Sequence, residues 1–139
     1  MRCRISRFAE KGLPVTPILV VLLLAGLETK HFLADYVLQN SWIIRGKGDL
    51  RASGSYAHAG LHVLGSLIVL LSFHLAVGLL AQMLVAEFVI HYAIDFTKAT
   101  TGRVIDAKTQ PTLYWSIYGF DQLLHHLTYI VMAYVVMVA

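Results

Sequence analysis

The sequence contains few charged residues and almost no cysteine. Asp, Glu, Lys and Arg make up 14% of its 139 residues, well below the roughly 25% of an average soluble protein. Cys3 is the only cysteine, which excludes an intramolecular disulfide and a zinc site built from several thiolates. The formal net charge is only +3, and no patch of interleaved basic and aromatic residues indicates a nucleic-acid surface. We therefore expect neither a disulfide-stabilised soluble domain nor a nucleic-acid partner.

Long runs of apolar residues make up most of the chain. Hydrophobic residues account for 58% of the chain, and the mean hydropathy is +0.68. Such runs are typical of integral membrane proteins. Residues 1–13 form a basic N-terminal tail, and residues 14–139 form a single membrane domain. The tail and the first apolar run together resemble a signal peptide, but no small-x-small cleavage site follows, so we interpret the run as a membrane helix.

Four apolar segments each reach the ~20 residues that a helix needs to cross a bilayer. We expect these helices to run from Pro14 or Pro17 to Gln39, from Ala57 to Val77, from Leu79 to Lys98, and from Leu113 to the C-terminus. Polar loops at residues 40–56 and 99–112 lie on one side, and a tight connection at Gly78 lies on the other. The sequence therefore predicts an all-α, four-helix transmembrane bundle.

The first and third segments carry the same polar motif. His31-Phe32-Leu33-Ala34-Asp35-Tyr36 matches His91-Tyr92-Ala93-Ile94-Asp95-Phe96 in its order of histidine, aromatic, two apolar residues, aspartate and aromatic. Glu28 and Glu87 precede the two copies by about one helical turn. The second helix of each half opens with two polar residues four apart, which are His58 and His62 in the first half and Asp121 and His125 in the second. We interpret the bundle as a duplicated two-helix unit with a pseudo-twofold axis along the membrane normal.

Ionisable residues inside these segments are costly, because one acid at a helix centre costs about 2.5–3.5 kcal/mol on insertion scales. Four-residue spacing puts the members of each pair on one helix face, and up-down topology brings all four pairs to the loop side of the membrane. A divalent metal ion would compensate these N and O donors. The expected ligands are His31, Asp35, His58, His62, His91, Asp95, Asp121 and His125. One or two ions fit this set, with zinc as the first choice and iron or manganese as alternatives.

Two other interpretations of these polar residues stay open. They can form a hydrogen-bonded core that holds four helices together, or a proton or ion pathway in a transporter or channel. Haem would not account for the carboxylates. His74 lies toward the opposite end of its helix, and His126 faces a different direction from His125, so we assign both of them structural roles.

The polar motifs, taken in order, resemble one known family. They comprise His31 to Gln39, His58-x-x-x-His62, His91 to Asp95, and Asp121-Gln122-x-x-His125. The set is similar to domain-of-unknown-function family 3307, and the resemblance covers roughly residues 24–139. It implies a small inner-membrane protein of bacteria or their phages, without an established activity. The His- and Asp-rich layout is also loosely similar to the LexA-regulated membrane-bound metal-dependent hydrolases, an analogy that favours a hydrolase but assigns no residue.

Metal-dependent hydrolysis of an amphiphilic or anionic small molecule is the leading functional hypothesis. The metal would activate a water molecule and polarise the substrate. Asp35 or Asp95 would orient or deprotonate that water, with Glu28 or Glu87 as an alternative base or as a partner that orients the ligands. A transporter or channel component and a non-catalytic membrane protein with a structural polar core are the alternatives.

The loop side of the membrane carries basic and aromatic residues. Arg45, Lys47 and Lys98 either attract an anionic head group or anchor the helix ends in the interface. An aromatic belt is expected at the same depth, formed by Trp42, Tyr56, Tyr114 and Trp115. Basic residues on the two sides are nearly balanced, and we place the loops and the site on the cytoplasmic side. Membrane lipid is the expected partner, and a homo-oligomer is left open.

Overall fold

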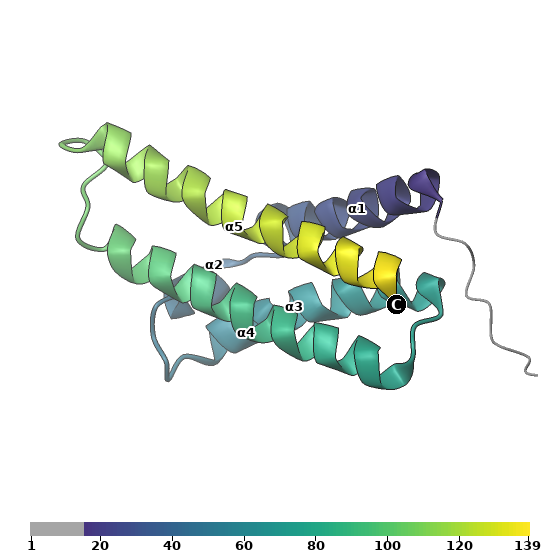
Figure 1. Cartoon of the computed structure of the whole chain (residues 1–139). Helices are drawn as coiled ribbons and strands as arrows, with labels where there is room; N and C mark the ends of the chain where they lie inside the picture. Colours follow the sequence, from purple (N-terminus) through teal and green to yellow (C-terminus); the bar gives the residue numbers. More distant parts are fainter. Residues whose placement is uncertain (1–15) are drawn as a thin grey trace, which may run out of the picture.

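The structure is a computed structural model that describes residues 16–139, and these residues are almost entirely helical (Figure 1). No strand occurs in this range, which confirms the all-α expectation. The N-terminal tail (residues 1–13), the boundary of the membrane domain at residue 14 and the alternative helix start at Pro14 lie outside the described residues.

Within residues 16–139, four long helices form the body of the protein. The α-helices are α1 (Pro17–Phe32), α2 (Ser41–Gly46), α3 (Ser53–Leu70), α4 (Val77–Gly102) and α5 (Pro111–Val138). A π-helix, η1 (Leu33–Val37), extends α1, and a 3₁₀ turn, η2 (Leu71–Phe73), extends α3. The four continuous helices span 21, 21, 26 and 28 residues, and each is long and apolar enough to cross a membrane. The chain is therefore a multi-pass membrane protein built as a four-helix bundle.

The first polar loop contains more helix than the sequence indicated. Its residues form α2, whose first backbone N–H groups are capped by the Asn40 side chain, which accepts hydrogen bonds from Trp42 and Ile43 at 3.0 Å. Helix α3, which was expected to begin near Ala57, begins at Ser53. Gly54 makes this start possible, because a Cβ atom there would lie 2.8 Å from the carbonyl oxygen of Trp42. This loop therefore packs as a short helix against α3.

The four long helices form a closed ring. In this ring α1 packs against α3, α3 against α4, α4 against α5, and α5 against α1. The start of α1, the α3–α4 connection and the C-terminus lie at one end, and α2 and the α4–α5 loop lie at the other (Figure 1). Exchanging α1 with α4 and α3 with α5 preserves every neighbouring pair, which is the arrangement expected of a duplicated two-helix unit.

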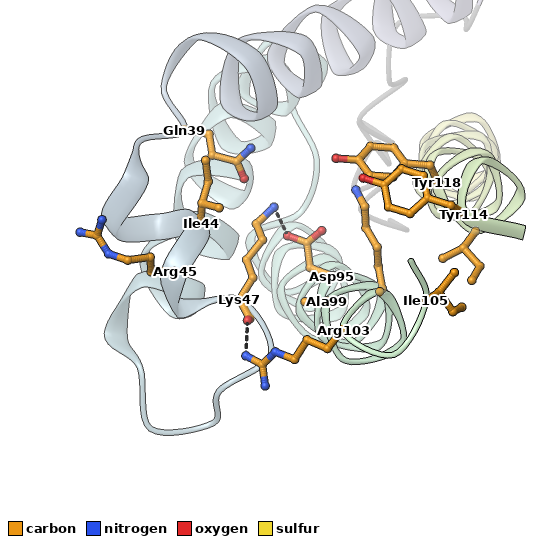
Figure 2. A pocket seen from close by; sticks show the side chains of 13 residues that line it. Gln39, Ile44, Arg45, Lys47, Asp95, Ala99, Arg103, Ile105, Tyr114 and Tyr118 are labelled. Carbon is orange, nitrogen blue, oxygen red and sulfur yellow. Dashed lines mark hydrogen bonds and ion pairs between the residues drawn. The ribbon is translucent and has the colours of Figure 1, made fainter. Parts of the chain in front are cut away.

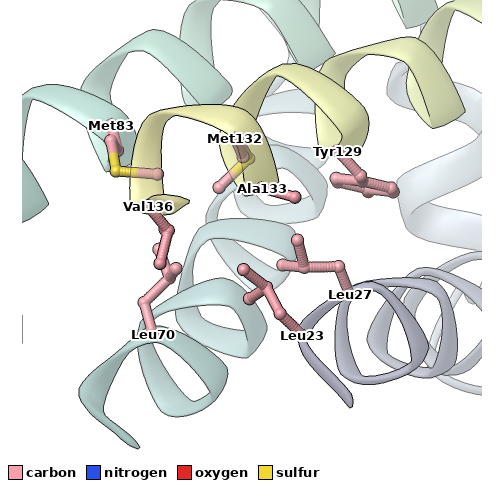
Figure 3. Packing of buried hydrophobic residues seen from close by; sticks show 8 residues of the cluster. All are labelled: Leu23, Leu27, Leu70, Met83, Tyr129, Met132, Ala133 and Val136. Carbon is pink, nitrogen blue, oxygen red and sulfur yellow. The ribbon is translucent and has the colours of Figure 1, made fainter. Parts of the chain in front are cut away.

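The interior of the bundle is divided into an apolar end and a polar end. Side chains from all four helices fill the end near the termini (Figure 3), and they are Leu23, Leu27, Leu70, Met83, Tyr129, Met132, Ala133 and Val136. Large apolar side chains such as Ile68 and Val85 point outward and are about two-thirds exposed, at 65% and 64%. Exposed apolar residues of this kind face lipid in a membrane protein. Polar side chains occupy the interior toward the α2 end.

Candidate metal centre

Ionisable side chains from all four long helices meet inside the polar end. Every one of the eight residues expected as metal ligands is buried or half-buried, and seven of them are less than 9% exposed. The shared cause is the four-residue spacing within each helix, which stacks two polar side chains on the face that the ring turns inward. The structure thus brings the four sequence pairs together as one cluster, which we call the His/Asp cluster.

Two groups of donor atoms within this cluster are close enough to hold a metal ion. The first group contains Asp35, His58, His62 and His91, and the second contains His91, Asp95 and His125. In each group the donor atoms all lie within 4.8 Å of one another. His91 belongs to both. Because a neutral imidazole offers one lone pair, His91 can complete only one group at a time.

The spacing of the donors resembles the edges of a metal coordination polyhedron. Metal–ligand bonds of about 2.0–2.2 Å place two ligands of a tetrahedral zinc ion roughly 3.4 Å apart. In the second group, His91 Nε2 lies 3.5 Å from Asp95 Oδ2, and His125 Nε2 lies 3.8 Å from Asp95 Oδ1. His58 Nε2 lies between the two aspartates, 3.0 Å from Asp35 Oδ1 and 3.2 Å from Asp95 Oδ2.

Several of these donors have no hydrogen-bond partner among the described residues. They include the Nε2 atoms of His91 and His125, both of them buried. Buried polar atoms are nearly always hydrogen-bonded, so such orphaned atoms need an explanation. Both histidines belong to the second group, whose third member, Asp95, is paired with Lys47 at 2.8 Å. The residues present therefore fit a divalent cation of the kind that imidazole and carboxylate ligands bind.

His31 and Asp121 flank the two donor groups without joining them. His31 Nδ1 is hydrogen-bonded to Tyr129 Oη at 2.9 Å, and its Nε2 lies 3.3 Å from Gln122 Oε1. Asp121 accepts a hydrogen bond from Lys98 at 2.8 Å, and its other oxygen lies 3.7 Å from His125 Nε2. These two residues therefore lie beside the donor groups and are not members of either.

The π-helix η1 places Asp35 at the centre of one group. Its carboxylate oxygen Oδ1 lies 3.2 Å from His62 Nε2 and within reach of His58, both on α3. Its other oxygen lies 3.3 Å from His31 Nε2. Single π turns widen a helix locally and are frequent at functional sites. The corresponding residues of the second copy, 93–97, lie in the regular helix α4.

The two glutamates occupy different environments, although both precede the motif by about a turn. Glu87 is buried and accepts hydrogen bonds from Ser66, at 2.8 Å, and from Lys30. Glu28 lies at the partly exposed surface and pairs with His126 at 2.8 Å. Neither glutamate belongs to a donor group.

The different placement of the glutamates has a simple cause in their spacing. Glu28 comes three residues before His31, whereas Glu87 comes four residues before His91. A difference of one residue turns a side chain by about 100° around the helix axis.

Four residues of this region were not singled out as site residues by sequence reasoning. Lys30 is buried at the base of the cluster, where its Nζ lies 3.5 Å from His62 Nδ1, and Tyr129 is 1% exposed beside it. Gln122 links His31 to Asp121, donating to the latter at 3.0 Å. Ser66 supports Glu87. A lysine inside an apolar segment, next to the first motif histidine, was the signal that could have revealed Lys30.

Lysines compensate most of the buried negative charge. Lys30 pairs with Glu87, Lys47 with Asp95 at 2.8 Å, and Lys98 with Asp121 at 2.8 Å. Within residues 16–139, Asp35 alone of these four has no lysine partner, and it contacts histidines instead. The four carboxylates and three lysines leave a formal charge of −1. A divalent cation would change this charge to +1.

A cavity of about 460 Å³ lies between α2, α4 and α5, next to the cluster (Figure 2). Asp95 lines this cavity and is the one residue of the two donor groups that does so. Lys47 reaches into the same space from the end of α2 (Figure 2). The second donor group therefore borders the cavity through Asp95, whereas no residue of the first group lines it.

Comparison with known proteins gives one match. The family described as Protein of unknown function (DUF3307) matches residues 18–139, which include all four membrane helices and the whole cluster. No curated protein and no solved structure matches the chain. The comparisons therefore identify a family and give no activity.

Proposed function

This chain belongs to the DUF3307 family of proteins of unknown function, and from the geometry of its His/Asp cluster we propose that it is a membrane-embedded, metal-dependent hydrolase. The observation that carries the proposal is the second donor group. The Nε2 atoms of its two histidines have no hydrogen-bond partner within residues 16–139, and its third member, Asp95, lines a cavity. Catalytic zinc sites have this composition, with three protein ligands and one position left for water or substrate.

His91, Asp95 and His125 would hold a single divalent ion, with zinc as the first choice and iron or manganese as alternatives. When bound, the ion would supply Lewis-acid chemistry, which activates water and polarises a substrate oxygen. The sharing of His91 between the two groups favours one ion over two. The first group then serves a different purpose, because His58 and His62 are not needed as ligands of that ion.

His58 is suited to be the general base. Its Nε2 atom lies 3.2 Å from Asp95, so it is within reach of a water molecule beside that group. Asp35, 3.0 Å away, would stabilise the imidazolium that forms. The water oxygen would form a bond to the carbonyl or phosphoryl centre while the bond to the leaving oxygen breaks. The proton taken by His58 would then pass to that leaving oxygen.

A transporter is the less favoured function because the polar residues do not continue across the bundle. Beyond Lys30 and Glu87 the interior is filled by the apolar core of Figure 3, which includes Leu27 and Met132. Ion pathways require polar side chains or water along their length. A site open toward one side only suits an enzyme acting at the membrane interface.

The membrane and its orientation are part of the proposal. We place the protein in the bacterial inner membrane, with the α2 end, the cavity and the His/Asp cluster toward the cytoplasm. Reporter fusions to the C-terminus and to the loop between α4 and α5 test this orientation. The loop reporter is expected to be active in the cytoplasm, and activity in the periplasm would reverse the assignment.

Metal analysis of purified protein tests the function. Full-length protein in detergent, supplemented with zinc and then dialysed, is expected to retain about one zinc ion per chain. His91→Ala should lose this zinc. His74→Asn is the matched control, because His74 is exposed at the far end of the bundle with φ 51°, a conformation that Asn tolerates.

The outcomes separate the candidate functions. Zinc in the wild type and the control but not in His91→Ala, together with hydrolysis of an anionic amphiphile, supports the hydrolase. Protein that never retains metal overturns the hydrolase proposal. Bound zinc without hydrolysis of any ester-containing amphiphile would instead assign the cluster a structural role.

A further inference from the structure

Two cavities lie side by side at the α2 end of the bundle. The first, of about 460 Å³, has a mixed lining, in which Lys47 and Arg103 (Figure 2) carry positive charge. Lys98 adds a third cation to this lining. The second, of about 390 Å³, lies between α4 and α5. Lys98 and Ile117 line both cavities, so the two spaces adjoin at these residues.

The second cavity is mainly apolar. The residues that give it this character are Ala93, Ile94, Ile117, Phe120 and Leu124. Phe120 is 60% exposed on the outer face of α5, where a membrane helix meets lipid. Both walls of this second cavity, α4 and α5, are helices long enough to cross a membrane. This cavity is therefore a groove on the lipid-facing side of the bundle.

The cations of the first cavity are available to an anion to different degrees. Among the described residues no carboxylate lies within ion-pair distance of Arg103, whose guanidinium donates to the backbone oxygen of Lys47 at 3.1 Å. Lys98 lies 3.9 Å from the centre of the Tyr118 ring and pairs with Asp121. Lys47 pairs with Asp95. If Asp95 serves a metal ion, Lys47 loses its partner and becomes available as well.

We propose that the two cavities together bind one lipid with an anionic phosphate head group. The phosphate lies in the first cavity among Lys47, Lys98 and Arg103, and an acyl chain lies in the groove between α4 and α5. As the substrate class of the hydrolase, this assignment rests on the proposed function. The binding site itself does not.

Each half of the ligand is recognised by a different physical interaction. Lysine and arginine bind phosphate oxygens through charge-assisted hydrogen bonds, and arginine matches their geometry with two parallel bonds. The volume of the first cavity lies in the usual range for small-molecule sites, about 300–1,000 Å³. The groove removes little apolar surface from water, because its ligand comes from the bilayer, so its contribution is to position the lipid beside Asp95. The shared wall at Lys98 places the head group and the chain at one depth.

Lipid binding can be measured on full-length protein in detergent with phosphatidic acid as the probe. Phosphatidylcholine and inorganic phosphate serve as comparison ligands. Phosphatidylcholine tests the contribution of the head-group charge, and inorganic phosphate tests the contribution of the acyl chain. We expect phosphatidic acid to bind at least about tenfold more tightly than either comparison ligand, which corresponds to about 1.4 kcal/mol.

Variants assign the binding to the two cavities. Arg103→Gln and Lys98→Gln should each weaken phosphatidic acid binding about tenfold, whereas Lys108→Gln, which removes an exposed charge outside both cavities, should not. Thr97→Trp fills the groove from an exposed position and should also weaken binding. Val89→Trp, on the same helix but outside the groove, is its control.

The same samples separate the two proposals. Equal binding by Arg103→Gln, Lys98→Gln and Lys108→Gln overturns the head-group site. Equal binding of phosphatidic acid and inorganic phosphate, or unaltered binding by Thr97→Trp, overturns the chain groove. Zinc measured in parallel shows which idea has failed. Protein that binds lipid without retaining zinc supports the lipid site and overturns the metal centre, and protein with the opposite behaviour does the reverse.

Discussion

Lys30 and Glu87 form an ion pair across the diagonal of the bundle. Lys30 lies on α1 and Glu87 on α4, two helices that are not neighbours in the ring. Both side chains are buried, at 8% and 1% exposure. Lys30 also donates to the backbone oxygen of His62 at 3.3 Å. The pair therefore forms the floor of the His/Asp cluster and separates it from the apolar core.

Removing one member of this pair should cost more than removing both. A lone buried charge is left uncompensated, so Lys30→Met or Glu87→Met alone should destabilise the protein by about 3–5 kcal/mol. The double variant should recover most of this loss, because two apolar side chains of similar length pack against each other and leave no buried charge unpaired. Thermal or denaturant unfolding in detergent measures the difference. Costs that simply add would contradict the pairing.

His58 and His125 should respond differently to substitution by glutamine. If the ion is held by His91, Asp95 and His125, His125→Gln loses zinc. His58→Gln should keep zinc and lose about 10²–10⁴-fold in turnover, the usual contribution of a general base. Metal content and initial rates on the same preparations test both statements. The reverse result, with zinc lost only from His58→Gln, would move the ion to the first donor group.

Zinc should stabilise the folded protein in proportion to its binding. At a free zinc concentration 100 times the dissociation constant, the expected gain is about 2.7 kcal/mol in the free energy of unfolding. Asp95→Ala should abolish this gain, while His126→Ala, outside both donor groups, should keep it. The shift of the unfolding midpoint with zinc concentration provides the measurement. An identical zinc response in Asp95→Ala and the wild type would contradict the assigned ligand.

Gly60 and Gly65 on α3 should differ when replaced by alanine. A Cβ atom at Gly60 meets no atom within 4 Å, so Gly60→Ala should stabilise the helix by about 0.5–1 kcal/mol. At Gly65 the added atom would lie 3.1 Å from Lys30 Cβ and 3.2 Å from its Cδ. The ion pair with Glu87 holds Lys30 in place, so Gly65→Ala should lose this gain or destabilise the protein. Equal effects in unfolding experiments would show that Lys30 moves freely.

Much of the fold was accessible from sequence because its signals are periodic. The apolar runs predicted four membrane helices, and the spacing of four placed His91 with Asp95 and His58 with His62 on inward faces. The short helix α2 was missed because much of its stability comes from packing against Gly54 of α3, which is a contact between segments. Its Asn40 cap is a local feature that the sequence did contain.

The cluster was predicted as a set, but not its internal division. Spacing along a helix identifies the face of a residue, and it does not identify the partner on another helix. For this reason the role of Lys30 was missed, since its partner Glu87 lies 57 residues away in the chain. Glu28 was grouped with Glu87 even though the one-residue difference in their spacing turns one to the surface and the other to the interior.

The π-helix at Leu33–Val37 has a consequence for the symmetry of the site. Two exact copies of a two-helix unit would create two equivalent wells for a cation, and the ion would be shared between them with equal occupancy. The widened turn around Asp35 has no counterpart in α4, so the two wells differ in energy. Because the two positions differ in energy, an ion in this duplicated bundle would have one preferred position. The other half of the bundle is then free to evolve a separate task.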